Sequence, residues 1–424
     1  MSETASLRTP PQTKFDPSRK MSAAAAATCD KIVDPFVYAD PPALDAAFAK
    51  LRAEDPLAWM EPEGFRPFWA VTKHADIMEI SRQNKIFTNS EREILSNEEV
   101  ENQVYAIMGG PHLVRTLVQM DDPDHYKFRH LTQQWFLPQN VRKRTDAIRA
   151  IAKEFIDKME DMGGECDFQN DIALHYPLRV IMQILGVPVE DEPRMLKLTQ
   201  ELFGANDEDL SRDGDALAKK DVGAGLAAMQ GVVADFFQYF TAMTHERRAN
   251  PRDDVSSVIA NGQIDGAPIG DFEAMSYYVI VAAAGHDTTS ASTGGGLLGM
   301  LQNPSELAKM MADTPTHART AVDEAIRWTT PVKHFMRTAH EDYDLRGKTI
   351  RAGESLMLNY PSGNRDEEVF EDPFSFRVDR TPNKLISFGY GGHMCLGMHL
   401  ARMEMAVLYE ELFSRVKSIE LAGE

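Results

Sequence analysis

The sequence is poor in cysteine, in basic residues and in long apolar runs. Its three cysteines, Cys29, Cys166 and Cys395, are too few and too scattered for a disulfide framework, which predicts a reducing compartment. The 45 lysines and arginines stand against 65 aspartates and glutamates, a formal net charge of −20 that argues against nucleic acid as a partner. No stretch reaches the roughly 20 apolar residues that span a bilayer, so we expect a soluble, cytoplasmic protein without a membrane partner.

The start of the sequence has the composition of a flexible tail. Residues 1–30 carry Ser, Thr, Pro, Gln and Lys without periodicity. The alanine run at 23–27 is too short for a signal peptide and lacks its charged lead. Residues 31–424 contain no repeat and no long linker, which predicts a single catalytic domain.

Helical periodicity dominates the rest of the sequence, and strand-like segments are few. The spacing of apolar residues predicts helices at 44–52, 73–82, much of 123–328, and 396–413, with strands at 68–72, 348–350 and 354–358. Residues 91–119 are mixed, and the Gly-Gly-Pro run at 109–111 breaks any helix there. Because long loops in compact domains are often functional, this segment is a candidate lid over a pocket. The predicted fold class is mainly α with a small β-rich region.

One cysteine is surrounded by glycines near the end of the sequence. Residues 388–397 read Phe-Gly-Tyr-Gly-Gly-His-Met-Cys-Leu-Gly, a tight loop that places Cys395 at the start of a helix. The helix dipole and the loop N–H groups favour thiolate over thiol, and haem iron is a suitable soft, cationic partner. A lone cysteine is more often a small buried apolar residue, but the glycines, Phe388 and His393 argue against that interpretation.

This loop resembles the haem-ligand loop of the cytochrome P450 family, Phe-Gly-x-Gly-x-His/Arg-x-Cys-x-Gly, without a mismatch. The resemblance extends from about residue 34 to the end of the sequence. It implies the P450 fold, with haem b buried between a long central helix and the helix that follows the cysteine. It also implies that Cys395 is the axial iron ligand, that His393 meets a haem propionate, and that Phe388 and Gly397 complete the cofactor-binding loop.

Within the family, the sequence is most similar to the soluble bacterial type that hydroxylates the monoterpene alcohol alpha-terpineol. Residues 285–290, 327–329 and 364–370 resemble that type especially. The N-terminal anchor helix of membrane-bound members is absent, which also indicates the soluble type. Members of the family usually continue past a position such as Glu424 into a terminal hairpin that touches the substrate, and this sequence ends before it.

A long apolar helix predicted at residues 272–301 has a polar centre. Residues 277–283 are too apolar for a solvated helix, whereas the following glycine and two threonines lower helix propensity by about 1–2 kcal/mol in total. The centre resembles the family signature Ala/Gly-Gly-x-Asp/Glu-Thr-Thr/Ser. The resemblance implies that Asp287 and Thr288 deliver protons to the dioxygen that haem activates, and that Gly285 leaves room for it.

Glu324 and Arg327 lie three residues apart on a predicted helix at 320–328 and therefore share one face. Such a pair alone is usually an exposed ion pair of small value. In the family this pair is buried and is joined by an arginine from the turn-rich stretch before the cysteine, and Arg380 matches that arginine best. The implied role is structural, since it holds the stretch that leads to the cysteine loop.

The haem propionates need cationic or hydrogen-bonding partners. His125 and Arg129 lie four residues apart on a helix whose first turn suits Pro123, and this stretch resembles the family's propionate-binding helix. Arg337, on the strand predicted after the Glu324 helix, matches a further propionate arginine of the family.

The resemblance predicts a haem-thiolate monooxygenase that inserts one atom of dioxygen into a C–H bond of a small hydrophobic substrate, a monoterpenoid or an aromatic hydrocarbon. Electrons would come from a [2Fe-2S] ferredoxin and its reductase, with Arg142, Lys143 and Arg144 as docking contacts on a monomer. Apolar residues near the expected pocket are the candidate substrate walls: Ile107, Met108, Phe203, Ile280, Ala283, Ala284, Val332 and Phe335.

Two alternatives stay open at this point. A peroxide-driven haem-thiolate peroxygenase would share Cys395 but would need neither the ferredoxin nor the pair Asp287 and Thr288. A non-catalytic haem-based sensor would need a signalling domain or an exposed partner surface, and the sequence contains no sign of either.

Overall fold

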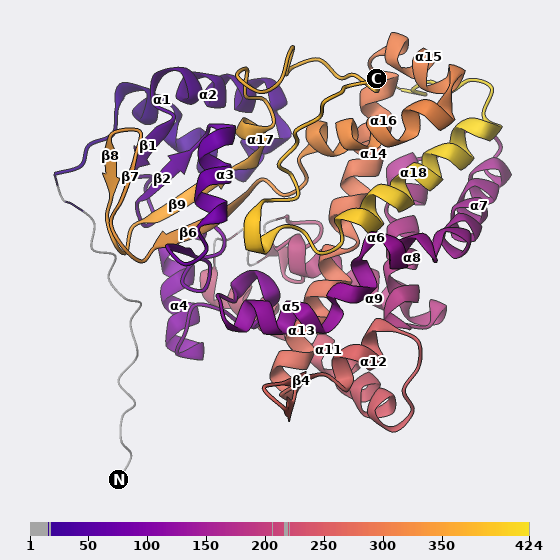
Figure 1. Cartoon of the computed structure of the whole chain (residues 1–424), viewed down its shortest axis with the longest axis horizontal. Coiled ribbons are helices and arrows are strands. Elements are labelled where there is room, and N and C mark those ends of the chain that lie inside the picture. The colour runs from indigo at the N-terminus through magenta and orange to yellow at the C-terminus, as the bar shows by residue number, and fades with distance from the viewer. Residues whose placement is uncertain (1–15, 17, 206, 216–218, 220, 424) are drawn as a thin grey trace. The chain divides into compact units, whose positions relative to one another are not determined.

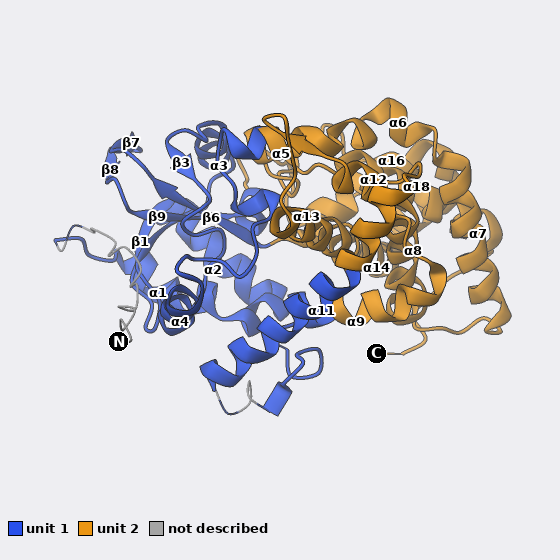
Figure 2. Cartoon of the chain, turned by 90° about the horizontal axis from the view of Figure 1, so that it is seen from below, with its two compact units in different colours: residues 1–126, 200–239, 333–363 blue, residues 127–199, 240–332, 364–424 orange. Residues whose placement is uncertain are grey.

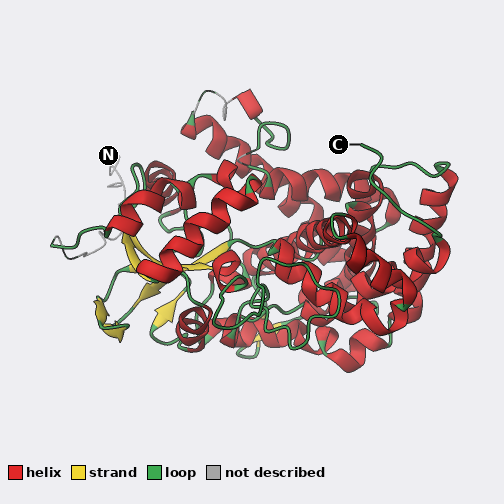
Figure 3. Ribbon diagram, turned by 90° about the horizontal axis from the view of Figure 1, so that it is seen from above, coloured by secondary structure: helices red, strands yellow, loops and turns green. Residues whose placement is uncertain are grey.

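The structure, a computed structural model, describes residues 16, 18–205, 207–215, 219 and 221–423, and helices dominate it (Figure 3). The predicted mainly α fold class is confirmed. The chain divides into two compact units (Figure 2), one of residues 1–126, 200–239 and 333–363 and one of residues 127–199, 240–332 and 364–424. The expected single domain of residues 31–424 covers both units and stays a prediction. Within the described part of the chain, no helix is both long and apolar enough to cross a membrane.

The first unit is built on a five-stranded sheet with the order β1-β2-β9-β6-β3. Figure 1 labels β1, β2, β9 and β6, and Figure 2 labels β3. Strands β2 and β9 pair in parallel, with Trp69 beside Leu356, and the other neighbours pair antiparallel. Strands β7 and β8 form a separate hairpin. The strands are β1 (Leu57–Met60), β2 (Phe68–Val71), β3 (Phe87–Thr88), β6 (His334–Ala339), β7 (Tyr343–Leu345), β8 (Lys348–Ile350) and β9 (Ser355–Asn359).

Helices pack on this sheet through a core that includes Phe48, Met60, Phe68 and Met357, all fully buried. The helical elements of this unit are α1 (Ala23–Val33), η1 (Pro35–Ala39), α2 (Pro41–Glu54), α3 (His74–Arg82), α4 (Glu98–Met108), η2 (Leu117–Gln119) and α17 (Tyr360–Gly363). The candidate lid at 91–119 is therefore not a plain loop, since it contains helix α4, which ends at Gly109 in the left-handed region with φ 69°.

Helix α1 corrects the expectation of a flexible tail over residues 1–30. Residues 1–15 and 17 lie outside the described residues, but Ser22 caps a helix that starts at Ala23. Cys29 and Ile32 of this helix are buried in the core of the first unit. The buried residues of α1 lie on one face of the helix, and packing of that face stabilises it.

The second unit is a helical bundle with one short hairpin. Its elements, including three helices with residues in both units, are α5 (Asp124–Gln133), η3 (Gln134–Phe136), α6 (Pro138–Arg142), α7 (Thr145–Asp161), η4 (Phe168–Ala173), α8 (His175–Leu185), η5 (Val189–Asp191), α9 (Glu192–Phe203), α11 (Val222–Ala249), α12 (Val255–Ala260), β4 (Gln263–Ile264), β5 (Ala267–Pro268), α13 (Asp271–Ala284), α14 (Asp287–Leu301), α15 (Pro304–Ala312), α16 (Thr314–Thr329), η6 (Gly391–His393) and α18 (Met398–Arg415).

The helix predicted over residues 272–301 is two helices, α13 and α14, separated at Gly285 and His286. A Cβ at Gly285 would lie 2.7 Å from Cγ1 of Ile181 on α8, so glycine permits the close approach of α8 to the break. Further along α14, a Cβ at Gly296 would lie 2.4 Å from Cβ of Ala325 on α16. Small residues therefore set how closely the neighbouring helices pack on this central pair.

Candidate active site

Cys395 lies in a turn between η6 and α18, and hydrogen bonds of the loop backbone hold it there. The Cys395 N–H donates to the Phe388 carbonyl at 2.8 Å, and the Met394 N–H donates to the Gly391 carbonyl at 3.2 Å. Gly389 and Gly391 have φ values of 68° and 73°, a conformation that favours glycine. The glycine spacing seen in the sequence is thus required by the turn that presents the cysteine.

Donors and cations surround the sulfur of Cys395. The side chain is exposed, yet enough protein lies around the sulfur that desolvation raises the thiol pKa. The backbone N–H groups of Gly397 and Met398 and the guanidinium groups of Arg129 and Arg402 oppose that rise in pKa. Each of these groups stabilises an anionic sulfur. The loop therefore favours the thiolate form of Cys395 when a positively charged ligand binds the sulfur.

Arg129 ties helix α5 to this loop. Its Nη2 donates to the Met394 carbonyl at 2.7 Å, and burial lowers the pKa of the guanidinium. His125 lies one turn earlier on α5, is 3% exposed, and has its Nδ1 3.8 Å from Oδ1 of Asp122. His393 and Phe388 are half-buried in the loop, and the Arg402 guanidinium lies 4.7 Å from the centroid of the Phe388 ring.

Arg337 is a buried cation on strand β6 of the first unit. It is 4% exposed, and its Nη1 donates to the neighbouring Met336 carbonyl at 2.7 Å. Desolvation lowers the pKa of Arg337, with Tyr360 and Asp121 opposing that effect. Within the described residues Arg337 forms no ion pair with a carboxylate, and a buried guanidinium of this kind is suited to an anionic ligand group.

The break between α13 and α14 carries polar groups on an accessible face. Asp287 is the first residue of α14, and burial raises the pKa of its carboxyl to about 6. Its Oδ2 is buried and has no hydrogen-bond partner among the described residues. The Thr288 hydroxyl donates to the Ala284 carbonyl at 3.0 Å and so bridges the break. Ala284 is exposed and Thr288 half-exposed although most of α13 is buried, which leaves room beside them for a ligand.

Glu324, Arg327 and Arg380 come together in one buried cluster in the second unit. Arg327 donates from Nε and Nη2 to the two Glu324 oxygens at 2.7 Å each, and Arg380 Nε donates to the same oxygens at 3.1 and 3.0 Å. The side chains of Glu324 and Arg327 are 0% exposed. We call these three residues the Glu324 cluster.

The Glu324 cluster holds the irregular chain that precedes the cysteine loop. Arg327 also donates to the carbonyls of Asn364, Pro373 and Ser375 at 2.9, 2.8 and 3.1 Å. Glu324 accepts further bonds from the Arg377 N–H at 2.9 Å and from Asn383 Nδ2 at 3.2 Å. These bonds replace the regular ladder that the segment lacks.

The candidate substrate residues fall in both units. Ile107, Met108, Phe203 and Phe335 belong to the first, and the first three of them are 53%, 42% and 53% exposed. Ile280, Ala283, Ala284 and Val332 belong to the second. Ala283 is fully buried beside the exposed Ala284, so the structure favours Ala284 over Ala283 as a pocket-lining residue. The assignments themselves stay predictions.

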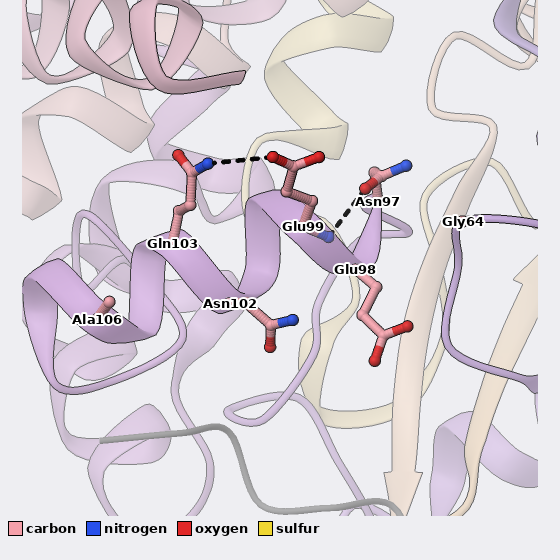
Figure 4. A pocket seen from close by; sticks show the side chains of 7 residues that line it. All are labelled: Gly64, Asn97, Glu98, Glu99, Asn102, Gln103 and Ala106. Carbon is pink, nitrogen blue, oxygen red and sulfur yellow. Dashed lines mark hydrogen bonds between the residues drawn. The ribbon is translucent and has the colours of Figure 1, made fainter. Parts of the chain in front are cut away.

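A hollow beside helix α4 involves none of the predicted residues (Figure 4). It is lined by Gly64, Asn97, Glu98, Glu99, Asn102, Gln103 and Ala106. Asn97 accepts the Glu99 N–H at 2.9 Å, and Gln103 donates to the Glu99 carboxylate at 3.4 Å. Five of its seven lining residues have carboxylate or amide side chains.

Two buried titratable residues near the break were missed by sequence reasoning. Glu404 on α18 is 1% exposed, burial raises its pKa well above the usual range, and a hydrogen bond with Thr289 opposes that rise. The available signal was an acid among the apolar residues of the last helix. His286 is 0% exposed and contacts residues 87 and 112 positions earlier in the chain. No local pattern indicates those contacts.

The comparison with protein families decides the identity. The family model of cytochrome P450 matches residues 88–418. The chain is a cytochrome P450. This P450 is similar to Cytochrome P450-terp of a Pseudomonas species, with 46% identity over 394 residues that make up 92% of the chain and 91% of the relative. The expected P450 fold and the oxygen-incorporating enzyme class are thereby confirmed, and the alternative of a non-catalytic sensor is not supported.

Solved structures agree with this assignment. The crystal structure of CYP108D1 from Novosphingobium aromaticivorans matches the P450 with a TM-score of 0.86 and 45% identity, covering 94% of this chain and 93% of the other. Mycobacterium marinum CYP268A2 in complex with pseudoionone matches with a TM-score of 0.81 and 31% identity, covering 96% and 94%.

The cofactor of this P450 is haem b, which family members bind through a cysteine thiolate. The residues present fit that group. Cys395 is a solvent-accessible thiol with N–H donors directed at its sulfur. Arg129, in the same unit as Cys395, is a cation whose pKa burial lowers, and its charge stabilises the anionic sulfur.

Proposed function

We propose that this P450 inserts one atom of dioxygen into a C–H bond of a small hydrophobic substrate, and that the thiolate of Cys395 would hold the haem iron. Haem supplies the oxygen chemistry, and a thiolate ligand favours O–O bond cleavage on it. The observation that carries the proposal is the cysteine loop, in which the N–H groups of Gly397 and Met398 and the charge of Arg129 stabilise an anionic sulfur. His393, Phe388 and Gly397 complete the loop in this proposal.

Asp287 and Thr288 handle protons in the proposed reaction. The pKa of Asp287 is raised to about 6, so both its protonation states are populated near neutral pH. The Thr288 hydroxyl gives its hydrogen to the Ala284 carbonyl at 3.0 Å, so it presents lone pairs on the accessible side of the helix. Thr288 is thus suited to accept a hydrogen bond, and Asp287 to exchange the proton.

Arg129, Arg337, His125 and His393 are the proposed partners of the haem propionates. Arg129 and Arg337 are guanidinium groups whose pKa values burial lowers, so an anionic ligand beside them stabilises their charged forms. The Glu324 cluster acts on the fold rather than on the reaction, because its groups are fully engaged with the chain before the loop.

The substrate class proposed is a monoterpenoid or an aromatic hydrocarbon. The name of Cytochrome P450-terp and the pseudoionone bound to CYP268A2 support a terpenoid. Ile280 and Ala284 offer apolar surface on the accessible face, which suits recognition by shape and exclusion of water. Electrons come from a [2Fe-2S] ferredoxin with its reductase, and the exposed Arg142 and Lys143, with Arg144, are the proposed docking contacts on a monomeric, cytoplasmic enzyme.

Spectroscopy of the purified holoprotein tests this function. The ferrous carbonyl complex is expected to give the haem-thiolate spectrum, and Cys395→His is expected to replace it with the histidine type. Titration of ferric protein with monoterpenoids and aromatic hydrocarbons is expected to produce the low-to-high-spin change. A histidine-type spectrum from the unmodified protein would overturn the proposal, and product formed better with peroxide than with the ferredoxin chain would favour a peroxygenase.

A further inference from the structure

His286 lies at the break between α13 and α14 and makes three close polar contacts. Its Nε2 is 2.7 Å from the carbonyl oxygen of Leu174, the residue before α8. Its Nδ1 is 3.2 Å from Oγ1 of Thr199 on α9 and 3.3 Å from Oδ1 of Asp287. The side chain is 0% exposed. One imidazole thus touches α8, α9 and the carboxyl proposed to carry the proton.

The contact with Leu174 selects the tautomer of the ring. A carbonyl oxygen only accepts hydrogen bonds, so Nε2 must carry the hydrogen. Burial lowers the pKa of His286 to about 4, which keeps the ring neutral near neutral pH. In the neutral ring Nδ1 then has a lone pair and no hydrogen. Two neighbours, Thr199 and Asp287, therefore compete for a single acceptor.

Each neighbour has two states. The single hydrogen of the Thr199 hydroxyl can go to Nδ1 or to the Leu196 carbonyl, which lies 2.9 Å away. An ionised Asp287 places lone pairs against the lone pair of Nδ1, whereas a protonated Asp287 can donate to it. His175 at the start of α8 is a further titratable side chain near His286, and its pKa is lowered by burial, by Lys158 and by His286.

We propose that His286 is a positioning residue for Asp287, because its Nδ1 accepts a hydrogen bond from the protonated carboxyl and so favours that state. Thr199 on α9 weakens this hold whenever its hydroxyl donates to Nδ1 instead of to Leu196. The inference rests on the proposed proton-handling role of Asp287 and extends it to His286, at the variable position of the family signature, and to Thr199, outside that signature. It makes the state of the carboxyl depend on helix α9.

Two substitutions at position 286 separate the two ring nitrogens. In His286→Gln the amide nitrogen can replace the Nε2–H donor toward Leu174, but no acceptor remains at Nδ1. In His286→Asn the amide oxygen can replace the Nδ1 acceptor, but the bond to Leu174 is lost. If His286 had only a structural role, the two variants would be impaired equally, or His286→Asn would be impaired more. If Nδ1 holds Asp287, only His286→Gln should change the protonation of Asp287, because it lacks the Nδ1 acceptor.

The test follows the inflection of the pH profile of kcat that Asp287→Asn abolishes, measured on holoenzyme with its reductase chain. Loss of one neutral hydrogen bond to the acid form is expected to lower that inflection by about 0.5–1 pH unit in His286→Gln. His286→Asn is expected to leave it in place, and Thr199→Val, which removes the competing donor, is expected to raise it. The inference is overturned if His286→Gln does not move the inflection, or if His286→Gln and His286→Asn move it equally. Neither result affects the proposed role of Asp287.

A second readout is independent of turnover. The infrared band of a protonated carboxyl that Asp287→Asn removes is expected to titrate at lower pH in His286→Gln and at higher pH in Thr199→Val. If His286→Gln fails to fold, Thr199→Val alone tests the inference. An infrared band that titrates at an unchanged pH in Thr199→Val overturns it. If Asp287→Asn removes neither a band nor an inflection, the proposed function of Asp287 fails first.

Discussion

The second unit contains two buried polar regions that differ in how completely their groups are paired. In the Glu324 cluster, both carboxylate oxygens accept charged donors at 2.7 Å from Arg327 and at 3.0 and 3.1 Å from Arg380. At the break between α13 and α14, Oδ2 of Asp287 is buried without a described partner. In the first region the carboxylate has both oxygens bonded to charged donors, and the second region keeps a carboxyl whose pKa is raised to about 6.

This difference separates a structural from a reactive arrangement. A buried ion pair that is fully hydrogen-bonded has little freedom to exchange protons or partners. A buried carboxyl with an unsatisfied oxygen is less stable, but its protonation responds to small changes nearby. Among the described residues, the Glu324 carboxylate has both oxygens paired, whereas Oδ2 of Asp287 beside the accessible helix face has no partner.

Glu324→Gln is expected to have the largest effect, because it leaves two buried guanidinium groups without a counter-charge. The free energy of unfolding is expected to fall by about 3–5 kcal/mol, together with haem content. Urea unfolding and the haem-to-protein absorbance ratio measure both. The matched control is Glu54→Gln, which breaks the exposed pair between Lys50 and Glu54 and should cost less than about 1 kcal/mol. Equal losses in the two variants would contradict the comparison.

Asp287→Asn is expected to slow turnover rather than destabilise the fold. Loss of a proton-transfer group typically lowers the rate about 100-fold or more, while the dissociation constant of the substrate should stay within about two-fold because Asn preserves the shape. Steady-state kinetics and spin-state titration measure the two. Asp271→Asn is the control, since Asp271 is likewise the first residue of its helix but is 78% exposed. Parallel losses of binding and rate would indicate misfolding instead.

Stability is expected to depend on pH through Asp287. Its folded pKa of about 6 lies above the ordinary value of 3.8 for an aspartate, so the folded state holds the proton more tightly than the unfolded state. The stabilising contribution is therefore present below pH 3.8 and is lost as pH rises through about 6. Relative to Asp287→Asn, the protein should lose about 1–2 kcal/mol between these limits, after allowance for partial exposure. Urea unfolding of both proteins across this pH range measures the difference in their free energies of unfolding. A stability relative to Asp287→Asn that rises with pH would contradict the prediction.

Thr288→Ala is expected to have the smallest effect on stability and rate, but a clear one on coupling. Without the hydroxyl, more of the reducing equivalents should end in hydrogen peroxide, and less product should form per electron pair. Product and peroxide yields per NADH consumed measure this. Thr293→Ala is the control, because Thr293 makes the same kind of bond, to the Thr289 carbonyl at 2.7 Å, one turn further along. Unchanged coupling in Thr288→Ala would argue against its role.

The cysteine loop could be predicted from the sequence because local requirements dictate it. Positive φ values at Gly389 and Gly391 favour glycine, and the turn fixes the spacing to Cys395. The polar centre of the long helix was likewise visible, although its division into α13 and α14 was not. The close approach of Ile181 on α8 to Gly285 at this division is a contact that no local pattern reveals.

Partners far apart in the chain were harder to foresee. Arg380 was matched to the Glu324 cluster by resemblance, but the carbonyls of Pro373 and Ser375 that Arg327 binds carry no side-chain signal. Helix α1 was missed because its short alanine-rich segment is stabilised by the core it covers. Burial of His286 against α8 and α9 is of the same long-range kind.

The Glu324 cluster has a consequence for how the chain before the cysteine responds to perturbation. Here amide groups are bonded to side chains of distant helices, with the Val378 N–H donating to Glu306 at 2.9 Å and the Arg377 N–H to Glu324 at 2.9 Å. In a β-sheet, backbone ladders survive most substitutions because any residue supplies the same N–H and C=O groups. In this segment a change in one acceptor side chain releases the amide groups bonded to it. Amide hydrogen exchange of Arg377 and Val378 therefore reports whether Glu324 and Glu306 still accept their hydrogen bonds.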